Sequence, residues 1–510
     1  MRRSIVAIAF VAGCVAAAPG LAHSQGGRGA AGGRGAGGPG APPPAANLIV
    51  TNARILTMDP ARPRADAMAV RGDKIVAMGT MAAIAPYVGP QTQTLDARGR
   101  LVIPGFNDSH AHFSGGAARL RSLDLYGVAS LADVQRLVAE RVARARPGEA
   151  ITGSGYDHTR WGTAWPTKAD LDKVAPNNPV VLTRASGHSA WVNSMTLRLS
   201  NITRDTPNPA AGEVQKDPRT GEPTGILLES AAGLARLPRD TSLTAAESRQ
   251  RSKDDLVAGM KLAATLGLTS IQSSSSTGEL DMFRELQKEG KLTLRYTGWL
   301  TLASAQSLAD RGIRTGQGDD WIRVGYLKGF IDGTLGDGTA AMFEPFDDRA
   351  DFVGLPRMTQ EQLDSAIILA DRLGFQVGIH AIGDKGANMV LNAYEKAALR
   401  NGTRGMRHRV EHAQLLKPDD IARFGLLGVV ASMQPTHATT DMRFAETRVG
   451  VERSRTAYVW RSILNGGGVL AFGTDWAVEP LDPMRGVFSG VSRTNIERMD
   501  PREGWFPEQK

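Results

Sequence analysis

Two histidines separated by one residue end a short apolar stretch, Leu101–His112. In an extended segment the side chains alternate between two faces, so His110 and His112 point the same way and can hold one cation between them. A divalent ion takes three or four protein ligands, so this pair is half of a metal site. The remaining ligands are expected at the ends of further strands, as histidines or carboxylates.

Residues of these types follow along the chain, each at the end of an apolar stretch that has the length of a strand. They are His380, His412 and Asp475. A lone histidine is more often structural, and His110 with His112 would leave the question open. Packing alone does not explain three further residues in register at separate strand ends. Together the five predict a metal site.

The elements that must position these residues alternate between apolar strands and amphipathic helices, which is typical of a parallel α/β fold. The strands after the first are expected at Leu268–Ser273, Leu294–Trp299, Ile322–Lys328, Gln376–His380, His408–His412, Val429–Gln434 and Val469–Asp475. Eight strands separated by helices predict a (β/α)8 TIM-like barrel, assigned to residues 101–490. Catalytic groups of such barrels lie at the C-terminal strand ends, where Lys328 also stands.

Other parts of the chain are expected outside the barrel. Residues 47–100 hold short β-like stretches, with Arg71–Lys74 as a turn, and predict a small N-terminal β-sandwich domain. About 150 residues separate the first two barrel strands, too many for a simple connection, so residues 122–250 are interpreted as an inserted subdomain able to close over the barrel mouth. Residues 491–510 are expected to form a truncated C-terminal tail.

The N-terminus has the layout of a secretory signal peptide over residues 1–24: two arginines, an apolar run and a small-residue stretch. Val11–Cys14 also resembles a lipoprotein cleavage box, which would leave a lipid on Cys14. Cys14 is the only cysteine, so the mature chain has no internal disulfide. Residues 25–46, rich in Gly, Ala and Pro, predict a disordered linker. We expect an exported protein, periplasmic or secreted, with lipid anchoring as the alternative and no integral membrane span.

The composition is that of an ordinary globular protein: 42% hydrophobic and 22% charged residues over 510 positions. Half of the formal charge of +8 comes from four arginines among the first 34 residues. Because no basic run with interleaved aromatics accompanies the rest, a nucleic-acid partner is not expected. A small-molecule substrate is expected, and a homodimer stays open.

A set of motifs extends over the chain from Asn47 to the C-terminus. The general ones are Pro104–His112, Lys328, Gly378–Asp384, Glu411 with His412, and Gly473–Asp475; the more specific ones are Gly155–Trp161, Arg184–Asn193, Gly225–Glu229, Lys328–Gly333 and Gln434–His437. With these motifs the chain resembles the amidohydrolase superfamily, in particular the branch, amidohydrolase family 3, that includes N-substituted formamide deformylases.

The resemblance implies a metal at the barrel mouth, usually zinc, as one or two ions. The implied ligands are His110, His112, Lys328, His380, His412 and Asp475. Lys328 would be carboxylated and bridge two ions, because a carbamate offers anionic oxygens that two metals share, whereas a protonated lysine is repelled. The alternative is an ordinary lysine beside a single ion, and divalent metals other than zinc stay open.

The expected reaction is hydrolysis of a carbon–nitrogen bond in a small amide, N-formyl or N-acyl compound. A metal-bound water loses a proton more readily than bulk water, and Asp475 is placed to accept that proton as general base. The hydroxide attacks the carbonyl, and Asp475 passes the proton to the departing nitrogen. The alternatives are hydrolysis of an ester, lactone or cyclic amide, and a non-catalytic binding relative disabled by the shortened C-terminus.

Further residues are predicted to contact the substrate. His188 is a candidate donor to the carbonyl oxygen or to another polar group, with a structural role as the alternative. The expected substrate-binding residues are Tyr156, Trp161, Trp191, Glu229, Asp332, Gln434 and Trp476. His158, His408 and His437 are expected not to be metal ligands.

The C-terminus departs from the pattern of the family. Relatives usually continue after strand eight with a helix and with strands that complete the small sheet domain, whereas this chain ends at Lys510. The small domain is therefore expected to be incomplete, and the last barrel helix to be short or missing. The expected ligands all precede this departure.

Overall fold

The structure is a computed structural model that describes residues 43–125, 127–156, 158, 161, 165–184, 189–209, 212–237, 243–336, 338–354 and 356–510. The predictions for the leader, for Cys14 and for most of the linker lie outside the described residues. The chain forms two compact units: one of Met1–Ala111 with Met260–Lys510, and one of His112–Gly259.

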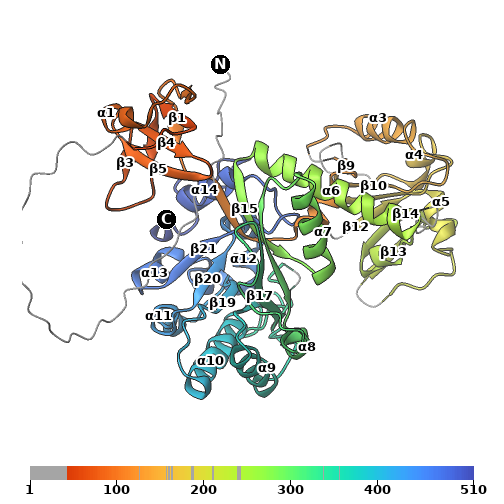
Figure 1. The fold of residues 1–510 in the computed structure, drawn as a ribbon. Helices are drawn as coiled ribbons and strands as arrows, with labels where there is room; N and C mark the ends of the chain where they lie inside the picture. The colour runs from red at the N-terminus through yellow and green to blue at the C-terminus, as the bar shows by residue number, and fades with distance from the viewer. Residues whose placement is uncertain are drawn as a thin grey trace, which may run out of the picture. The chain divides into compact units, whose positions relative to one another are not determined.

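Eight parallel strands form a single sheet in the order β21-β20-β19-β18-β17-β16-β15-β8 (Figure 1). They are β8 (Phe106–Ala111), β15 (Leu268–Ser274), β16 (Arg295–Thr301), β17 (Ile322–Phe330), β18 (Val377–Ala381), β19 (Arg409–His412), β20 (Val430–Met433) and β21 (Val469–Phe472). Each neighbouring pair is parallel, and the sheet curls into a nearly closed barrel. The barrel predicted from the sequence is confirmed.

The first and last strands of the barrel, β8 and β21, are not paired by a regular strand ladder among the described residues. Side-chain and backbone hydrogen bonds link β8 to the segment after β21. The Asp108 carboxylate accepts the N–H groups of His110 and Thr474, both at 3.0 Å, and the Thr474 hydroxyl at 2.6 Å. The Asp475 N–H donates to the His110 carbonyl at 2.7 Å. A Cβ at Gly473 would lie 2.5 Å from the His110 nitrogen, so only glycine fits there. The seam therefore fixes Asp475 beside His110.

Helices pack outside the strands of the barrel (Figure 1). They are α7 (Thr277–Lys288), α8 (Ala305–Asp310), α9 (Gln360–Arg372), α10 (Asp384–Asn401), α11 (Pro418–Leu427), α12 (Pro435–Ser454), α13 (Trp460–Asn465) and α14 (Pro483–Ser492). The boundary between the two units falls within helix α6 (Ala245–Thr265). Helix α9 shows why they form: Thr359 and Gln362 make a capping box, and Leu363, Ile367 and Ala370 form its buried face. The helix after the last strand is α14, with 10 residues.

The C-terminal tail is packed into the barrel unit. The buried Arg493 guanidinium donates to the carbonyls of Trp505 at 2.5 Å, Tyr458 at 2.9 Å and Ala457 at 3.4 Å. It also lies over the Trp460 ring, 4.3 Å from the centroid. Since buried donors need acceptors, this single side chain ties the tail to the loop between α12 and α13.

The N-terminal part forms two small sheets, in the orders β5-β4-β1-β6 and β3-β2-β7. Their strands are β1 (Leu48–Thr51), β2 (Arg54–Leu56), β3 (Arg64–Ala65), β4 (Ala67–Arg71), β5 (Lys74–Gly79), β6 (Gln93–Asp96) and β7 (Leu101–Val102), with the short helix α1 (Met81–Ile84). The expected turn joins antiparallel β4 and β5, and Gly72 adopts the positive φ of 59° that this turn requires. Ala46, assigned to the linker, is only 4% exposed and donates to the Tyr87 carbonyl, so ordered structure begins before residue 47.

The second unit contains a six-stranded sheet in the order β13-β14-β12-β11-β10-β9. Its elements are α2 (Phe113–Arg119), β9 (Leu123–Asp124), α3 (Leu131–Val142), β10 (Ile151–Tyr156), α4 (Lys168–Asp172), β11 (Val180–Arg184), β12 (Ser189–Val192), α5 (Ser194–Leu199), β13 (Gly212–Lys216) and β14 (Pro223–Glu229). The unit spans residues 112–259, whereas the sequence placed an insertion at 122–250.

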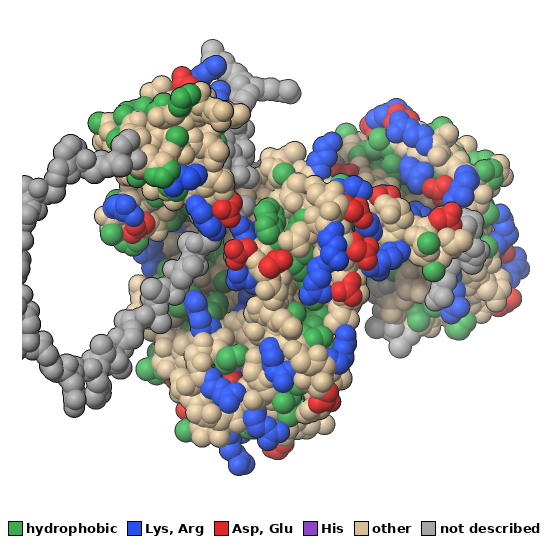
Figure 2. All heavy atoms as spheres, in the orientation of Figure 1, with side chains coloured by type: hydrophobic (Ala, Val, Ile, Leu, Met, Phe, Trp, Pro, Cys, Tyr) green, Lys and Arg blue, Asp and Glu red, His purple; other side chains and the backbone are tan. Residues whose placement is uncertain are grey.

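In the described part of the chain, every helix is too short or too polar to cross a bilayer. On the face drawn in Figure 2, lysine and arginine side chains are interspersed with aspartate and glutamate and do not gather into one basic area.

Candidate metal centre

Three predicted ligands converge at the C-terminal ends of the barrel strands. One ligand atom each from His110, His412 and Asp475 lies within 4.8 Å of the other two, and all three residues are buried. The His110 Nε2 atom lies 3.7 Å from the Asp475 Oδ1 atom, and the rings of His110 and His412 are 5.0 Å apart. Two imidazole nitrogens and one carboxylate oxygen form a donor set that divalent metals take in proteins. The residues present therefore fit a divalent metal.

Two members of this group have an unusual backbone. His412 has a φ of 73° and Asp475 a φ of 56°, the left-handed region that residues with a side chain rarely adopt. His412 is the last residue of β19, and Asp475 lies three residues after the end of β21. Strained conformations of this kind cluster at functional sites, because the surrounding structure holds them for the sake of side-chain placement.

The orientation of His110 is set by a carboxylate inside the barrel. The His110 Nδ1 atom and the Glu411 Oε2 atom are 2.5 Å apart, and both side chains are fully buried. A hydrogen bond at Nδ1 leaves Nε2 as the metal-binding nitrogen. Glu411 therefore fixes which face of the ring is offered to an ion.

Arg409 holds Glu411 in turn. Its guanidinium donates to Glu411 at 2.7 and 3.2 Å, to Gln272 at 2.5 Å, to Ser432 at 2.7 Å and to the Ser109 carbonyl at 2.9 Å. Burial alone would raise the pKa of Glu411, but Arg409 and His110 outweigh burial and lower it well below its usual range. The Glu411 carboxylate thus stays charged and keeps its hydrogen bond to His110.

The other two barrel histidines are held by neutral acceptors. His412 Nδ1 lies 2.8 Å from the Gln434 Oε1 atom. His380 Nε2 lies 2.9 Å from the Gly333 carbonyl and 3.6 Å from the Asp332 Oδ1 atom. The His380 and His412 rings are 4.5 Å apart, but His380 is not a member of the group of three.

Burial keeps these imidazoles uncharged. It lowers the pKa of His110, lowers that of His380 to about 3, and lowers that of His412 well below the ordinary value. The positive charge of Lys328 acts in the same direction on all three. Neutral imidazole is the form that binds metal, so the histidines are in the required state.

Lys328 lies beside the same group. Its Nζ atom is 3.3 Å from His110 Nε2, and the rings of Trp299 and Phe330 lie 5.1 and 5.0 Å from it. Burial lowers the pKa of Lys328 to about 8. An uncharged amine is the form that reacts with carbon dioxide, so this environment suits the predicted carbamate.

His112 stands outside the strand that carries His110. Strand β8 ends at Ala111, and His112 has a ψ of 63°, so the alternation assumed for an extended chain does not continue through it. It is half-buried and is the first residue of the second unit. Its role as a ligand stays a prediction.

Three predicted substrate contacts lie within the core of the second unit. Tyr156 and Trp191 are fully buried there, with their rings 5.5 Å apart, and Trp161 packs against the same cluster. The indole N–H groups of Trp161 and Trp191 donate to the carbonyls of Val128 and Thr167, at 2.9 and 2.8 Å. His188 and the side chain of Glu229 lie outside the described residues.

Asp332 and Trp476 are also buried, within the barrel unit. Asp332 accepts the N–H groups of Ala341 at 2.9 Å, Gly383 at 2.8 Å and Ile382 at 3.1 Å, and so braces the segments after β17 and β18. Trp476 is 7% exposed and directly follows Asp475. Their contacts with a substrate stay predictions.

Sequence reasoning missed the roles of Arg409 and Asp108. Arg409 and Glu411 carry opposite charges two positions apart, on one face of a fully buried four-residue strand. Charges in such a strand must be paired, so the sequence could have predicted that Arg409 and Glu411 form an ion pair. Asp108 lies within the Pro104–His112 motif, but Thr474, which donates two hydrogen bonds to its carboxylate, lies far along the chain.

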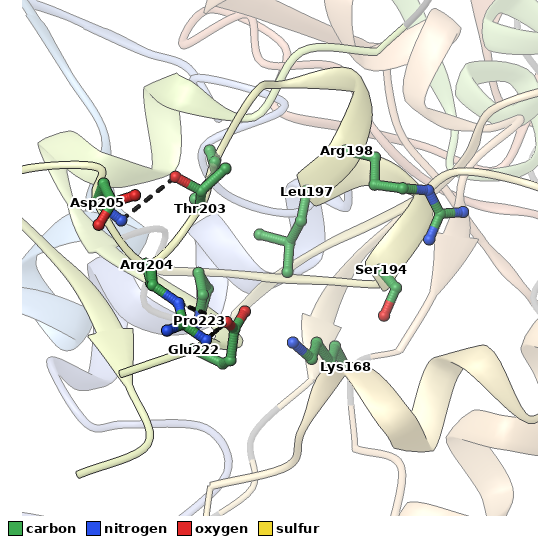
Figure 3. Close-up of a pocket in the computed structure, with 10 residues that line it drawn as sticks. Lys168, Ser194, Leu197, Arg198, Thr203, Arg204, Asp205, Glu222 and Pro223 are labelled. Carbon is green, nitrogen blue, oxygen red and sulfur yellow. Dashed lines mark hydrogen bonds and ion pairs between the residues drawn. The ribbon is translucent and has the colours of Figure 1, made fainter. Parts of the chain in front are cut away.

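The second unit has a hollow of its own, with a volume of about 490 Å³ (Figure 3). Arg204 on its wall is paired with Glu222 at 2.9 and 2.6 Å, and Lys168, Ser194 and Arg198 complete the labelled polar side chains on the other side. None of the residues predicted from the sequence lines this hollow. The candidate metal centre is a separate feature of the barrel unit.

The profile of the Amidohydrolase family matches residues 93–509. The chain belongs to the amidohydrolase family. Its relatives include the protein LONG AFTER FAR-RED 3 of Arabidopsis thaliana, which is 34% identical over 92% of this chain and 82% of that protein. The N-substituted formamide deformylase of Arthrobacter pascens is 30% identical over 88% of this chain and 84% of that enzyme.

Among solved structures, this amidohydrolase resembles an uncharacterized metal-dependent hydrolase from Pyrococcus furiosus. The TM-score is 0.70 at 28% sequence identity, covering 90% of this chain and 91% of that one. The predicted family is confirmed, and the barrel with its His-His-Asp group is that of a metal-dependent hydrolase.

Proposed function

We propose that this amidohydrolase hydrolyses a carbon–nitrogen bond of a small amide, N-formyl or N-acyl compound. The observation that carries the proposal is the buried convergence of His110, His412 and Asp475 at the barrel mouth. The deformylase from Arthrobacter pascens, whose name gives an N-substituted formamide as substrate, supports this bond type.

His110, His412 and Asp475 would hold one divalent ion, with zinc as our choice from the donor set. Such an ion polarises a carbonyl oxygen and lowers the pKa of water. Lys328, His112 and His380 would complete the site, and a carboxylated Lys328 would permit a second ion. Glu411 and Gln434 orient the two histidines by their hydrogen bonds at Nδ1.

Asp475 performs the proton transfers in this proposal. Its Oδ1 atom lies 3.7 Å from His110 Nε2, and its Oδ2 atom lies 3.8 Å from His437 Nε2. As general base it takes a proton from the attacking water, and it then gives this proton to the departing nitrogen. The buried setting keeps bulk water from competing for that proton.

Asp475→Asn tests this assignment. We expect most of the metal to stay bound and kcat to fall by about 10²- to 10⁴-fold, because the amide cannot accept the proton. Metal content by elemental analysis and turnover on a panel of amides, esters and lactones are the measurements. Turnover near that of the wild type would place the base elsewhere, and a folded, metal-loaded wild type that turns over nothing on the panel would contradict the enzyme itself.

Lys328→Ala tests the number of ions. Because a carbamate bridges two ions, we expect the variant to lose metal and to regain part of it when short carboxylic acids are added. Lys328→Met, of similar length, is the control for lost packing between Trp299 and Phe330. Unchanged metal content in both variants would show a lysine without a bridging role.

A further inference from the structure

The first turn of helix α12 contains buried polar side-chain atoms that make no hydrogen bond to the described residues. In the described part of the protein, no hydrogen-bond partner faces Gln434 Nε2, Thr436 Oγ1 or His437 Nε2. These residues are 0%, 5% and 9% exposed. Leaving a buried donor unsatisfied costs about 1–3 kcal/mol each, so three within four positions indicate a place built for a ligand.

Two of these atoms adjoin the candidate metal centre. The Gln434 Oε1 atom accepts a hydrogen bond from His412 Nδ1 at 2.8 Å. The amide N–H₂ group of Gln434 is therefore available to another partner. His437 Nε2 lies 3.8 Å from Asp475 Oδ2, too far for a hydrogen bond. The His437 ring is nearly parallel to that of His412, at 11° and 6.1 Å. The first turn thus lies next to the Oδ2 atom of Asp475, whereas His110 lies next to its Oδ1 atom.

The charges around this turn restrict what it can bind. Asp475 is a direct neighbour of His437, and Asp441 and Glu479 interact with His437 electrostatically. Glu479 also accepts the Thr440 hydroxyl at 3.0 Å, one turn further along the helix. Even when Asp475 binds a cation, a carboxylate or phosphate placed here would face the acidic side chains of Asp441 and Glu479, so the charges favour an uncharged ligand group.

The unpaired atoms further require an acceptor. The Gln434 amide nitrogen only donates, and the neighbouring Asp475 carboxylate favours the His437 tautomer that carries its proton on Nε2. We propose that the first turn of α12, Gln434–His437, is a substrate subsite that binds an uncharged hydrogen-bond acceptor, an amide or urea oxygen, on the amine side of the scissile bond.

This subsite rests on the proposed function for its orientation. Asp475 gives its proton to the departing nitrogen, so the amine portion of the substrate lies next to Asp475. Its Oδ2 atom faces His437, whereas Oδ1 faces His110. The amine portion therefore meets α12, and the acyl portion meets the histidines of the metal centre.

Three probes that share a formyl group test the subsite: N-formylglycinamide, N-formylpropylamine and N-formylglycine. Their amine portions end in an uncharged amide, an apolar chain and a carboxylate. We expect kcat/KM to fall in that order, because only the amide offers an uncharged acceptor. An equal preference for the three, or a preference for the carboxylate, overturns the subsite.

Variants of the two donors should change this selectivity. In His437→Phe and in Gln434→Glu, which keeps an acceptor for His412, the ratio of kcat/KM for the amide over the apolar probe should fall about three- to tenfold. His437→Gln restores a donor and should recover part of the ratio. Thr439→Val is the matched control on α12 and should keep the ratio of the wild type. The Thr439 hydroxyl already has two partners, the Thr436 carbonyl at 2.9 Å and the hydroxyl of Ser489 on α14 at 3.1 Å, so it is not a free donor for a substrate.

Calorimetric binding of the same probes to metal-stripped protein separates the two proposals. Binding that favours the amide, without turnover of any probe, would overturn the proposed function and keep the subsite. If the probes are turned over but the ratio of kcat/KM for the amide over the apolar probe is the same in the wild type and in both donor variants, the subsite is overturned and the proposed function is kept. Metal-stripped protein that binds none of the probes, or all three equally, also overturns the subsite.

Discussion

Two buried carboxylates lie close to histidines of the same barrel, Glu411 to His110 and Asp332 to His380. The two carboxylates are held in different ways. Glu411 lies on strand β19 and is paired with the Arg409 guanidinium at 2.7 Å, whereas Asp332 follows β17 and is held by backbone N–H groups. Burial acts to raise the pKa of both. For Glu411 the arginine and His110 reverse this effect, whereas for Asp332 the pKa rises to about 7.

One side of the site is therefore positioned by strands, and the other side is positioned by loops. The residues that hold His110 lie on or beside β8, β15, β19 and β20, whose positions the sheet fixes. The groups that hold His380 belong to segments beyond the ends of β17 and β18. A guanidinium makes a buried carboxylate an anion that orients a ligand firmly, while backbone N–H groups mainly fasten loops.

The largest effect is expected from Arg409→Met. Removing the guanidinium leaves Glu411 buried without its cation, which should lower the free energy of unfolding by about 3–5 kcal/mol. Denaturant unfolding of metal-free protein measures this loss. Arg284→Met, which removes an exposed pair with Asp281, is the control and should cost less than about 1 kcal/mol. Equal costs in both variants would mean that the buried network does not differ from a surface pair.

Glu411→Gln should weaken metal binding about 10- to 100-fold, because His110 loses the charged partner that fixes its tautomer. Competition with a chromogenic chelator measures the affinity. The double variant Arg409→Met/Glu411→Gln separates orientation from stability, since removing both charges should recover much of the unfolding free energy and leave the affinity low. Recovery of affinity in the double variant would contradict the orienting role.

The smallest effect is expected from Asp332→Asn. One carboxylate oxygen becomes an N–H₂ group that faces backbone donors, so stability should fall by about 1–3 kcal/mol. Metal affinity should change less than in Glu411→Gln, because His380 Nε2 keeps the Gly333 carbonyl at 2.9 Å. A larger loss of affinity than that of Glu411→Gln would reverse the comparison between the two sides.

The barrel could be predicted from the sequence because its strands are short apolar runs with polar residues at one end. Strand β18 was expected to end at His380 and ends at Ala381, and β19 ends at His412 as expected. The C-terminal ends of parallel strands meet on one side of a barrel, so topology alone brings His110, His412 and Asp475 to the same side of the barrel.

The remainder of the site depends on contacts that no local pattern contains. The alternation argument rests on an extended chain, and β8 ends one residue before His112, so the role of His112 stays a prediction. The tryptophans at 161 and 191 carry N–H groups that suit a ligand equally well, yet they donate to the carbonyls of Val128 and Thr167. Which acceptor a buried donor meets is decided by packing between distant segments, and packing is absent from the periodicity of a sequence.

The seam at Asp108 has a consequence for how the protein is made. Asp108 and His110 belong to the first barrel strand, and their partners Thr474 and Asp475 are among the last residues of the barrel to be translated. A nascent chain therefore carries its first histidine through the synthesis of the other barrel strands without the carboxylate that completes the group. The complete group of three can form only after Asp475 has been translated.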